Sequence, residues 1–244
     1  MTVVLKLGGS LITQKDERET VDTDALTEAG RIISEAEVPE LVVVHGAGSF
    51  GHYHADSFGV SKASGTRNTE AIRQIHDAMG RLNKAVLDYL NDHGLPAIPV
   101  RPLSTGYRPE ADAVWLATDQ VEAMLEEGFL PVLHGDIFTT RGAGATIVSG
   151  DELVVSLAES LDADRIGLCS GVPGVLDHDG AVIDRIETFD DVAAVLGESE
   201  ETDVTGGMAE KVRTLLGTDV PASIFDLEGL PAFLAADSPG TRIE

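Results

Sequence analysis

Short runs of continuous apolar residues alternate along the chain with longer segments in which apolar residues recur every three or four positions. The continuous runs are rich in β-branched residues and predict buried strands, at residues 2–9, 40–46, 96–100, 129–136, 164–171 and 220–226. The periodic segments predict amphipathic helices, at residues 23–36, 66–94, 119–128, 151–163, 189–197 and 206–217. A hairpin is predicted across residues 137–151, where Gly142 and Gly144 supply the turn.

This alternation of strand and helix predicts an α/β fold, a three-layer αβα sandwich with a mostly parallel central sheet. The chain has 244 residues, of which 43% are hydrophobic, so it can build one substantial core. No repeat or linker interrupts the pattern, and we expect a single domain over residues 1–244. Ligands of such folds bind at the carboxyl ends of the strands.

The balance of charge narrows the range of partners. Lysine and arginine number 17 against 42 acidic residues, which gives a net charge of −25. Such an anionic surface repels nucleic acid and anionic membranes, and it is typical of a halophile, whose salt-rich cytosol screens the repulsion. The apolar runs are too short to cross a bilayer, and the single cysteine, Cys169, fits a reducing cytoplasm. We therefore expect a cytoplasmic protein that acts on small molecules.

Three glycine-rich segments stand at predicted strand ends or helix starts. They read KLGGS at residues 6–10, HGAGSFGH at 45–52 and TDVTGGMAEKV at 202–212. Glycines let backbone N–H groups approach a phosphate closely, and the start of a helix attracts anions. The clustering of scarce cations supports this interpretation, because three of only five lysines fall in or near these segments: Lys6, Lys15 and Lys211. The sequence therefore predicts a phosphate-binding site.

Neither of two common nucleotide motifs is present in full. The P-loop pattern G-x-x-x-x-G-K-[ST] does not occur in the sequence. The stretch GAGSFG at residues 46–51 matches the spacing of the dinucleotide fingerprint, but the pattern predicts no helix directly after it and no acid for a ribose. A Rossmann-type dinucleotide site is therefore disfavoured.

The order of the motifs resembles that of the amino-acid kinase superfamily over nearly the whole chain. The matching segments are KLGGSLITQK, GAGSFGH, HGD, SGDELVVSLA, SGVPGVLD and DVTGGMAEKV. The histidine after the second glycine loop and the VSGD segment resemble the branch whose acceptor is isopentenyl phosphate. The resemblance implies an amino-acid kinase fold, with an acceptor-binding half at about residues 1–150 and an ATP-binding half at residues 151–244.

The resemblance also implies an activity. A member of this branch is a transferase that uses ATP and Mg²⁺ to convert isopentenyl phosphate to isopentenyl diphosphate, a step of isoprenoid biosynthesis in the mevalonate pathway. It further implies a homodimer that binds these small molecules; nucleic acid and membranes are already disfavoured as partners by the charge.

The resemblance assigns roles to residues by position. Catalytic roles fall to a set in which the aspartate orients the lysines: Lys6, Lys15, His52, Asp151 and Lys211. The nucleotide side is formed by Lys6, Gly8, Gly9, Ser10, Ala47, Ser170, Gly171, Gly174, Gly207 and Lys211. The acceptor phosphate is held by Gly46, Ala47, Gly48, Gly51, His52, Ser149 and Gly150. No metal site built from side chains is expected.

Two positions depart from the family pattern. Alanine replaces the middle glycine of a triplet at residue 47, and the phosphate cradle survives only if the φ angle of Ala47 is negative. Pro173 stands where relatives often have aspartate, and this weakens any nucleotide contact assigned to that acid.

A histidine suits position 52 if the acceptor is a phosphate monoester. Such an acceptor is already ionised near neutral pH, since its second pKa is about 6, so transfer needs positioning and charge neutralisation rather than a general base. His52 can donate a hydrogen bond to the acceptor phosphate and add positive charge. We interpret the neighbouring histidines, His45 and His54, as structural, and His134 as a satisfied polar residue at a strand end.

The tail of the acceptor needs an apolar slot. Ile75 and Met79 lie one turn apart on the long predicted helix, close in sequence to the second glycine loop, and are the candidates for it.

Two alternatives stay open from the sequence. One is another kinase of the same fold that acts on a phosphonate or a nucleoside monophosphate. An acceptor of the acetylglutamate type is disfavoured, because the sequence shows no set of residues that would recognise its amino or acyl-amino group. The other is a protein that binds a nucleotide or oxyanion without turnover, although the combination of Lys6, Lys15, Asp151 and Lys211 argues against it.

Overall fold

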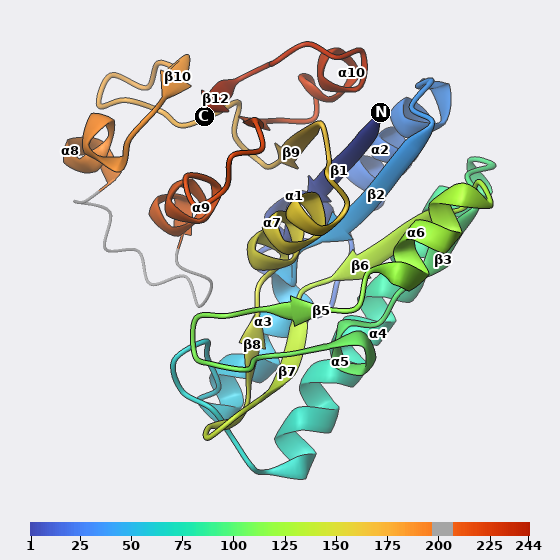
Figure 1. The fold of residues 1–244 in the computed structure, drawn as a ribbon, viewed down its shortest axis with the longest axis vertical. Helices are drawn as coiled ribbons and strands as arrows, with labels where there is room; N and C mark the ends of the chain where they lie inside the picture. Colours follow the sequence, from blue (N-terminus) through green and yellow to red (C-terminus); the bar gives the residue numbers. More distant parts are fainter. Residues whose placement is uncertain (197–206) are drawn as a thin grey trace.

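A single eight-stranded sheet organises the protein in a computed structural model that describes residues 1–196 and 207–244 (Figure 1). The strand order is β10-β12-β11-β9-β1-β2-β6-β3, and every pairing is parallel except that of β11 with β12. These strands are β1 (Thr2–Leu7), β2 (Glu40–His45), β3 (Ala97–Pro99), β6 (Leu130–His134), β9 (Arg165–Cys169), β10 (Arg185–Ile186), β11 (Ala222–Phe225) and β12 (Thr241–Ile243). The predicted mostly parallel αβα sandwich is confirmed.

Helices cover both faces of this sheet. One face packs against α1 (Gly9–Ile12), α2 (Thr23–Glu35), α3 (Gly48–Phe58), α4 (Thr69–Asp92) and α10 (Leu230–Leu234). The other face packs against α6 (Asp119–Glu126), α7 (Gly150–Ser160), α8 (Ala193–Leu196) and α9 (Gly207–Leu215). The remaining elements are α5 (Pro102–Thr105), the 3-10 turn η1 (Phe189–Asp191) and the short pair β4 (Gly106–Tyr107) and β5 (Trp115–Leu116). Among the described residues, no helix combines the length and the apolar character that a membrane span requires.

The alternation of side chains along β1 explains how a lysine reaches the site. Val3 and Leu5 belong to the core under α2 and α4, whereas Val4 belongs to the core under α7. Successive side chains of a strand point to opposite faces, so Lys6 shares the α7 face with Val4. The lysine at the carboxyl end of the central strand is thereby aimed at the start of α7.

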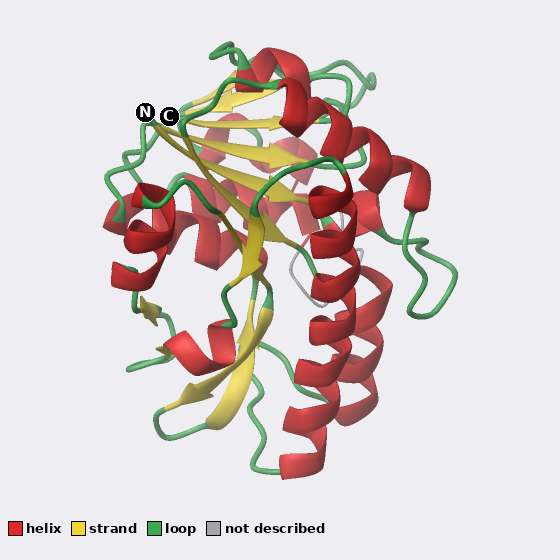
Figure 2. Cartoon of the chain, turned by 90° about the vertical axis from the view of Figure 1, so that its right-hand side faces the viewer, coloured by secondary structure: helices red, strands yellow, loops and turns green. Residues whose placement is uncertain are grey.

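A hairpin extends past the carboxyl edge of the sheet, alongside the lower part of α4 (Figures 1 and 2). It consists of β7 (Asp136–Thr140) and β8 (Gly144–Val148); of the two predicted glycines, Gly142 lies in the turn and Gly144 begins β8. A small separate core, which contains Val60, Ile75, Ile137 and Ala145, joins it to α4 and to the segment after α3. The hairpin thus builds an apolar wall beyond the ends of the strands.

Two of the expected elements differ in the structure. Residues 48–58 form helix α3, which begins inside the second glycine loop, so the expectation that no helix directly follows this loop is wrong. The helix expected over residues 189–197 is divided into the turn η1 and the short helix α8. The helix expected from residue 206 begins at Gly207, and the expectations for residues 197–206 lie outside the described residues.

Candidate active site

A cavity of about 980 Å³ opens at the carboxyl edge of the sheet, where β1, β2, β6 and β9 end. Most residues that the sequence singled out line it: Lys6, Gly8, Gly9, Ser10, Lys15, Gly46, Ala47, Gly48, Gly51, His52, Ile75, Met79, Ser149, Gly150, Asp151, Ser170 and Lys211. Residues that are more than 200 positions apart in the sequence therefore share one cavity. This placement follows from the parallel sheet, whose strand ends meet at the same edge.

A buried ion pair lies at the centre of the cavity wall. Lys6 Nζ is 2.6 Å from Asp151 Oδ1, and both side chains are almost fully buried. The expected orientation of a lysine by Asp151 is thus observed for Lys6. A buried pair is retained only when its geometry is good, because both charges lose their hydration. The pair presents a fixed ammonium group to the cavity.

The start of α7 holds Asp151 in place. Ser149 caps this helix: its hydroxyl accepts a hydrogen bond from the Glu152 N–H, and the Glu152 carboxylate accepts one from the Ser149 N–H. Arg108, which is fully buried, donates to both oxygens of Glu152 at 2.7 and 2.8 Å. Burial opposes ionisation of Glu152, but the bonds from Arg108 hold the pKa of this carboxyl below its ordinary value. Lys62 then bridges Glu152 to Glu210 of α9, at 3.2 and 3.6 Å.

Two glycine loops pack backbone against backbone at the cavity. We call residues 8–10 the first glycine loop and residues 46–48 the second. A Cβ atom added to Gly9 would lie 2.2 Å from the Gly48 nitrogen, and one added to Gly46 would lie 2.5 Å from the Gly9 nitrogen. Real Cβ atoms do not approach other atoms so closely, so only glycine fits here.

The second glycine loop runs directly into helix α3. Ala47 is the N-cap residue with φ −79°, so the negative φ that alanine requires at this position is confirmed. Gly48 has φ +48°, and the Ser49 N–H donates to the Thr13 hydroxyl at 3.0 Å. The N-terminus of an 11-residue helix therefore faces the cavity and carries the partial positive charge that attracts anions. His52 lies in the second turn of this helix and lines the same cavity.

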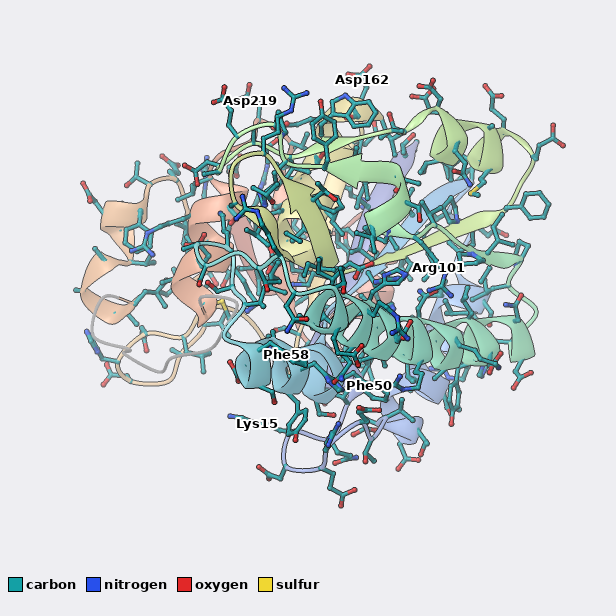
Figure 3. All side chains as sticks on the ribbon, turned by 90° about the horizontal axis from the view of Figure 1, so that it is seen from below. Lys15, Phe50, Phe58, Arg101, Asp162 and Asp219 are labelled. Atoms are coloured by element: carbon teal, nitrogen blue, oxygen red, sulfur yellow. The ribbon has the colours of Figure 1, made fainter. Side chains whose placement is uncertain are left out.

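Lys15 lies on the loop that joins α1 to α2 (Figure 3), beside α3. Glu19 fastens this loop to two helices: its carboxylate is 2.8 Å from His54 Nε2 on α3 and accepts two hydrogen bonds from Arg81 on α4. Its φ of +52° is unusual for a residue with a side chain and is maintained by these contacts. The interpretation of His54 as a structural residue is confirmed, because the ring holds the loop and does not line the cavity.

Part of the cavity wall is apolar. Ile75 and Met79 of α4 are almost completely buried yet line the cavity, together with Ile147 and Val148 of β8. The sulfur of Met79 lies against Gly51, where an added Cβ would be only 2.7 Å away. The predicted pair on the long helix thus forms part of an apolar slot next to the second glycine loop.

Three predicted nucleotide residues do not line the cavity. Gly174 packs against Thr241 and Val182, where a Cβ would be 2.7 Å from each, and this explains the glycine by packing. A Cβ atom added to Gly171 would lie 3.9 Å from the Ser10 hydroxyl oxygen. Gly207 begins α9 with φ +60°, and its carbonyl is 3.4 Å from Lys211 Nζ. Their roles toward a nucleotide stay predictions.

Buried polar groups lie directly beneath the second glycine loop. His134 was expected to be a satisfied polar residue, but only its Nδ1 has a partner, and its Nε2 has none among the described residues. Asp136, which lines the cavity, lies 2.8 Å from His76 Nδ1 and accepts the Ile137 N–H. The hydrogen bond that His76 donates to the Asp136 carboxylate raises the pKa of His76 against the effect of burial.

Several lining residues were not identified from the sequence: Thr13, Asp16, Arg18, Ser49, Tyr53, Ala55, Asp56, Gly135, Asp136, Ile147 and Val148. Asp136 and Gly135 belong to the HGD segment, which repeats the strand–histidine–glycine order of residues 45–46 and could have been recognised by that likeness. Arg18 stacks on the ring of Tyr53 at 3.8 Å, a contact that no local pattern announces.

Comparison with known proteins places this site in context. The model of the amino acid kinase family matches residues 1–217. An isopentenyl phosphate kinase of Haloferax volcanii is 58% identical over 242 residues, which cover 99% of this chain and 98% of that protein. An isopentenyl phosphate kinase of Methanothermobacter thermautotrophicus is 35% identical over 88% of this chain and 85% of its own length.

Among solved structures, one described as X-ray structures of isopentenyl phosphate kinase superposes with a TM-score of 0.86 at 28% identity, and covers both chains completely. The halophilic character expected from the charge is in keeping with the relative from Haloferax volcanii. The likeness therefore extends over the whole fold and every segment that lines the cavity.

Proposed function

The chain belongs to the amino acid kinase family, and from this premise we propose that it transfers the γ-phosphoryl group of ATP to isopentenyl phosphate and forms isopentenyl diphosphate. One observation carries the proposal. A buried Lys6–Asp151 pair, two interlocked glycine loops and apolar side chains line one cavity, which is the combination that a triphosphate, a monophosphate and a short hydrocarbon tail require.

The donor phosphates are assigned to the cationic part of the cavity. Lys6, Lys15 and Lys211 converge there from β1, the α1–α2 loop and α9. Negative charge spreads over the transferred phosphoryl group in the transition state, and fixed cations stabilise it without reorganisation. Mg²⁺ would be held chiefly by phosphate oxygens and water, as it usually is beside nucleotides. Bound there, it would neutralise charge between the β- and γ-phosphates.

The acceptor phosphate is assigned to the second glycine loop and the N-terminus of α3. Backbone N–H groups suit a dianion that must stay reactive, because they orient its oxygens and carry no full charge. The acceptor is ionised near neutral pH, so no residue is needed to remove a proton. His52, from the same helix, donates a hydrogen bond to this phosphate and offsets the repulsion between two anions.

The slot between α4 and β8 is assigned to the hydrocarbon tail. Ile75, Met79 and Ile147 present apolar side chains there, and burial of each methylene group is worth about 0.8 kcal/mol. A nucleoside monophosphate would instead need polar partners for its base and ribose. The apolar lining therefore favours an isoprenoid acceptor over a nucleotide acceptor.

Several features of the wider assignment rest on the family resemblance and composition. We assign the acceptor to residues of the 1–150 half and the nucleotide chiefly to the 151–244 half, with Lys6 and the first glycine loop shared between them. The active form is a homodimer, as the family resemblance implies, and it acts in the cytoplasm. Cys169 is compatible with a reducing compartment, since burial raises the pKa of its thiol to about 12 and keeps it unreactive. Light scattering of the purified protein measures the oligomeric state.

Parallel ATP-consumption assays test the proposed function. Purified protein is supplied with Mg²⁺-ATP and, separately, with isopentenyl phosphate, uridylate or fosfomycin. Turnover with isopentenyl phosphate and formation of the diphosphate support the proposal. Turnover only with uridylate or fosfomycin would replace it with another kinase activity, and ATP binding without any turnover would identify a binding protein.

Replacement of the active-site histidine tests the mechanism. His52→Ala should lower kcat with isopentenyl phosphate by about 10²-fold, because one donor to the reacting phosphate is lost. His178→Ala removes an exposed histidine that does not line the cavity and is the matched control. Kinetics of His52→Ala that equal those of the control would remove this histidine from the mechanism.

A further inference from the structure

Two histidines that the reaction does not use lie buried beneath the second glycine loop. His45 and His134 are the last residues of β2 and β6, and they are register partners in the sheet. Both are completely buried, with ring centroids 5.4 Å apart. In each case Nδ1 is 3.0 Å from the carbonyl oxygen of the following glycine, Gly46 or Gly135. Both glycines line the cavity.

The hydrogen bonds fix the tautomer of His45. A carbonyl oxygen only accepts, so the Nδ1 that faces Gly46 must carry the proton. The opposite nitrogen, Nε2, lies 3.2 Å from Nδ2 of Asn83, a fully buried residue of α4 whose amide donates to it. Burial and the neighbouring His134 lower the pKa of His45 to about 3. The ring is therefore a neutral donor with one defined orientation at any physiological pH.

This donor controls the direction of the next peptide unit. In a trans peptide the carbonyl and the following N–H point in opposite directions, and the described chain has no cis peptide bonds. His45 holds the Gly46 carbonyl toward the core, and the N–H of Ala47 is therefore turned toward the cavity. That N–H has no hydrogen-bond partner among the described residues, although Ala47 lines the cavity at the N-terminus of α3.

We propose that His45 is a positioning residue for the acceptor phosphate, which locks the Gly46–Ala47 peptide so that the Ala47 N–H donates to a phosphate oxygen. The inference rests on the proposed function, since it takes the anion at this loop to be the acceptor monophosphate. His45 never touches the substrate; it acts through the peptide. Asn83 also fixes the orientation of the His45 ring, because its amide donates to Nε2 on the side opposite to Gly46.

Two substitutions at residue 45 separate this role from packing. The amide nitrogen of asparagine occupies about the place of histidine Nδ1, whereas that of glutamine occupies the place of Nε2. His45→Asn therefore keeps the donor to the Gly46 carbonyl and His45→Gln loses it, while both remove the ring. A hydrogen bond to a charged group is worth about 1.5–3 kcal/mol, so a mispointed N–H should raise KM by about 10- to 100-fold.

We expect His45→Gln to raise the KM for isopentenyl phosphate by this factor and to leave the KM for ATP within about twofold. His45→Asn should keep both constants near those of the unchanged protein. Equal effects of the two variants, or an effect on ATP alone, would overturn the inference. Failure of the unchanged protein to use isopentenyl phosphate would instead refute the proposed function, before any variant is compared.

A second measurement keeps the inference testable if the variants do not fold. The Ala47 amide proton of the unchanged protein is followed by NMR while isopentenyl phosphate is added. A hydrogen bond to phosphate should move its resonance downfield and slow its exchange with solvent. An unchanged Ala47 resonance, in a sample that binds the ligand as shown by shifts at His52, would contradict the proposed role.

Discussion

The two walls of the cavity stabilise negative charge by different means. The wall formed by β1, α7 and α9 uses full charges, with the Lys6–Asp151 pair at its centre and Lys211 beside it. The wall formed by β2, α3 and α4 uses backbone N–H groups, a helix N-terminus and neutral buried histidines. The difference matches the chemistry assigned to each wall, because the charged wall meets the phosphoryl group in transfer, whereas the neutral wall orients a nucleophile and leaves it reactive.

The charged wall should depend most on Lys6. Lys6→Met removes the ammonium group and leaves Asp151 buried without its partner, so kcat should fall by about 10²- to 10³-fold, together with a loss of stability of about 3–5 kcal/mol. Steady-state kinetics and thermal unfolding measure the two effects. Lys84→Met, at an exposed lysine on α4, is the control and should change neither. A Lys6→Met protein with normal kcat would show that the charged wall is not catalytic.

The neutral wall should depend on its backbone geometry. An alanine Cβ at Gly48 would lie 2.2 Å from the Thr13 hydroxyl, and φ there is +48°. Gly48→Ala should destabilise the protein by about 2–4 kcal/mol and raise the KM for the acceptor, since both strain and overpacking act on the loop. Gly59→Ala is the matched control, because φ there is +63° but no atom lies within 4 Å of an added Cβ. Equal losses in both variants would show that only strain matters.

The neutral histidines should make the stability of the folded protein decrease at acidic pH. The pKa of His45 is lowered from its ordinary value of 6.5 to about 3 in the folded state, so the unfolded chain binds more protons between these values. The stability that neutral His45 provides is present above pH 6.5 and is lost as pH falls toward 3, by at most about 1.4 kcal/mol per pH unit. In denaturant unfolding between pH 7 and 5, His45→Asn should reduce this slope. An unchanged slope would mean that His45 is not neutral when folded.

A smaller dependence of stability on pH, of opposite sign, is expected from His76 at the edge of the same wall. Asp136 raises the pKa of His76, and Asp77 acts in the same direction, whereas burial and Arg101 oppose them. Arg101 lies alongside α4 (Figure 3). The contribution of protonated His76 is complete below its ordinary pKa of 6.5 and is lost as pH rises through the raised value. Thermal unfolding from pH 6 to 9 should show this loss in the unchanged protein and not in His76→Gln; the same loss in both would exclude the pair as its source.

The sequence predicted the sheet better than the second glycine loop. Strands such as residues 40–46 are identified by continuous β-branched runs, and α4 by a long apolar stripe, because these patterns are local. Helix α3 was missed because its sequence, GSFGHYHADSF, is only weakly amphipathic and starts at a glycine with positive φ. Its start is fixed by packing on Gly9 and Thr13, and these contacts are distant in sequence.

The same limit applies to the site. Motif order brought together the lysines, Asp151 and the glycines, because the segments that carry them follow strand ends or begin helices at the same edge of the sheet. Ile147 and Arg18 reach the cavity only through the hairpin and through the loop fastened by Glu19, and no spacing rule predicts either position. His45 was interpreted as structural, and it is buried and bonded to the Gly46 carbonyl; the role that we propose for it through the Ala47 N–H depends on peptide orientation, which a sequence does not display.

The contact between the two glycine loops has a mechanical consequence. Gly9, Gly46 and Gly48 touch through main-chain atoms, with no side chain between them that could change rotamer. With the donor and acceptor phosphates on these loops as proposed, the distance between the two phosphates would be fixed by main-chain van der Waals contact. Movements that admit or release a ligand would then come from neighbouring segments, and one added methyl group at the contact would increase that distance.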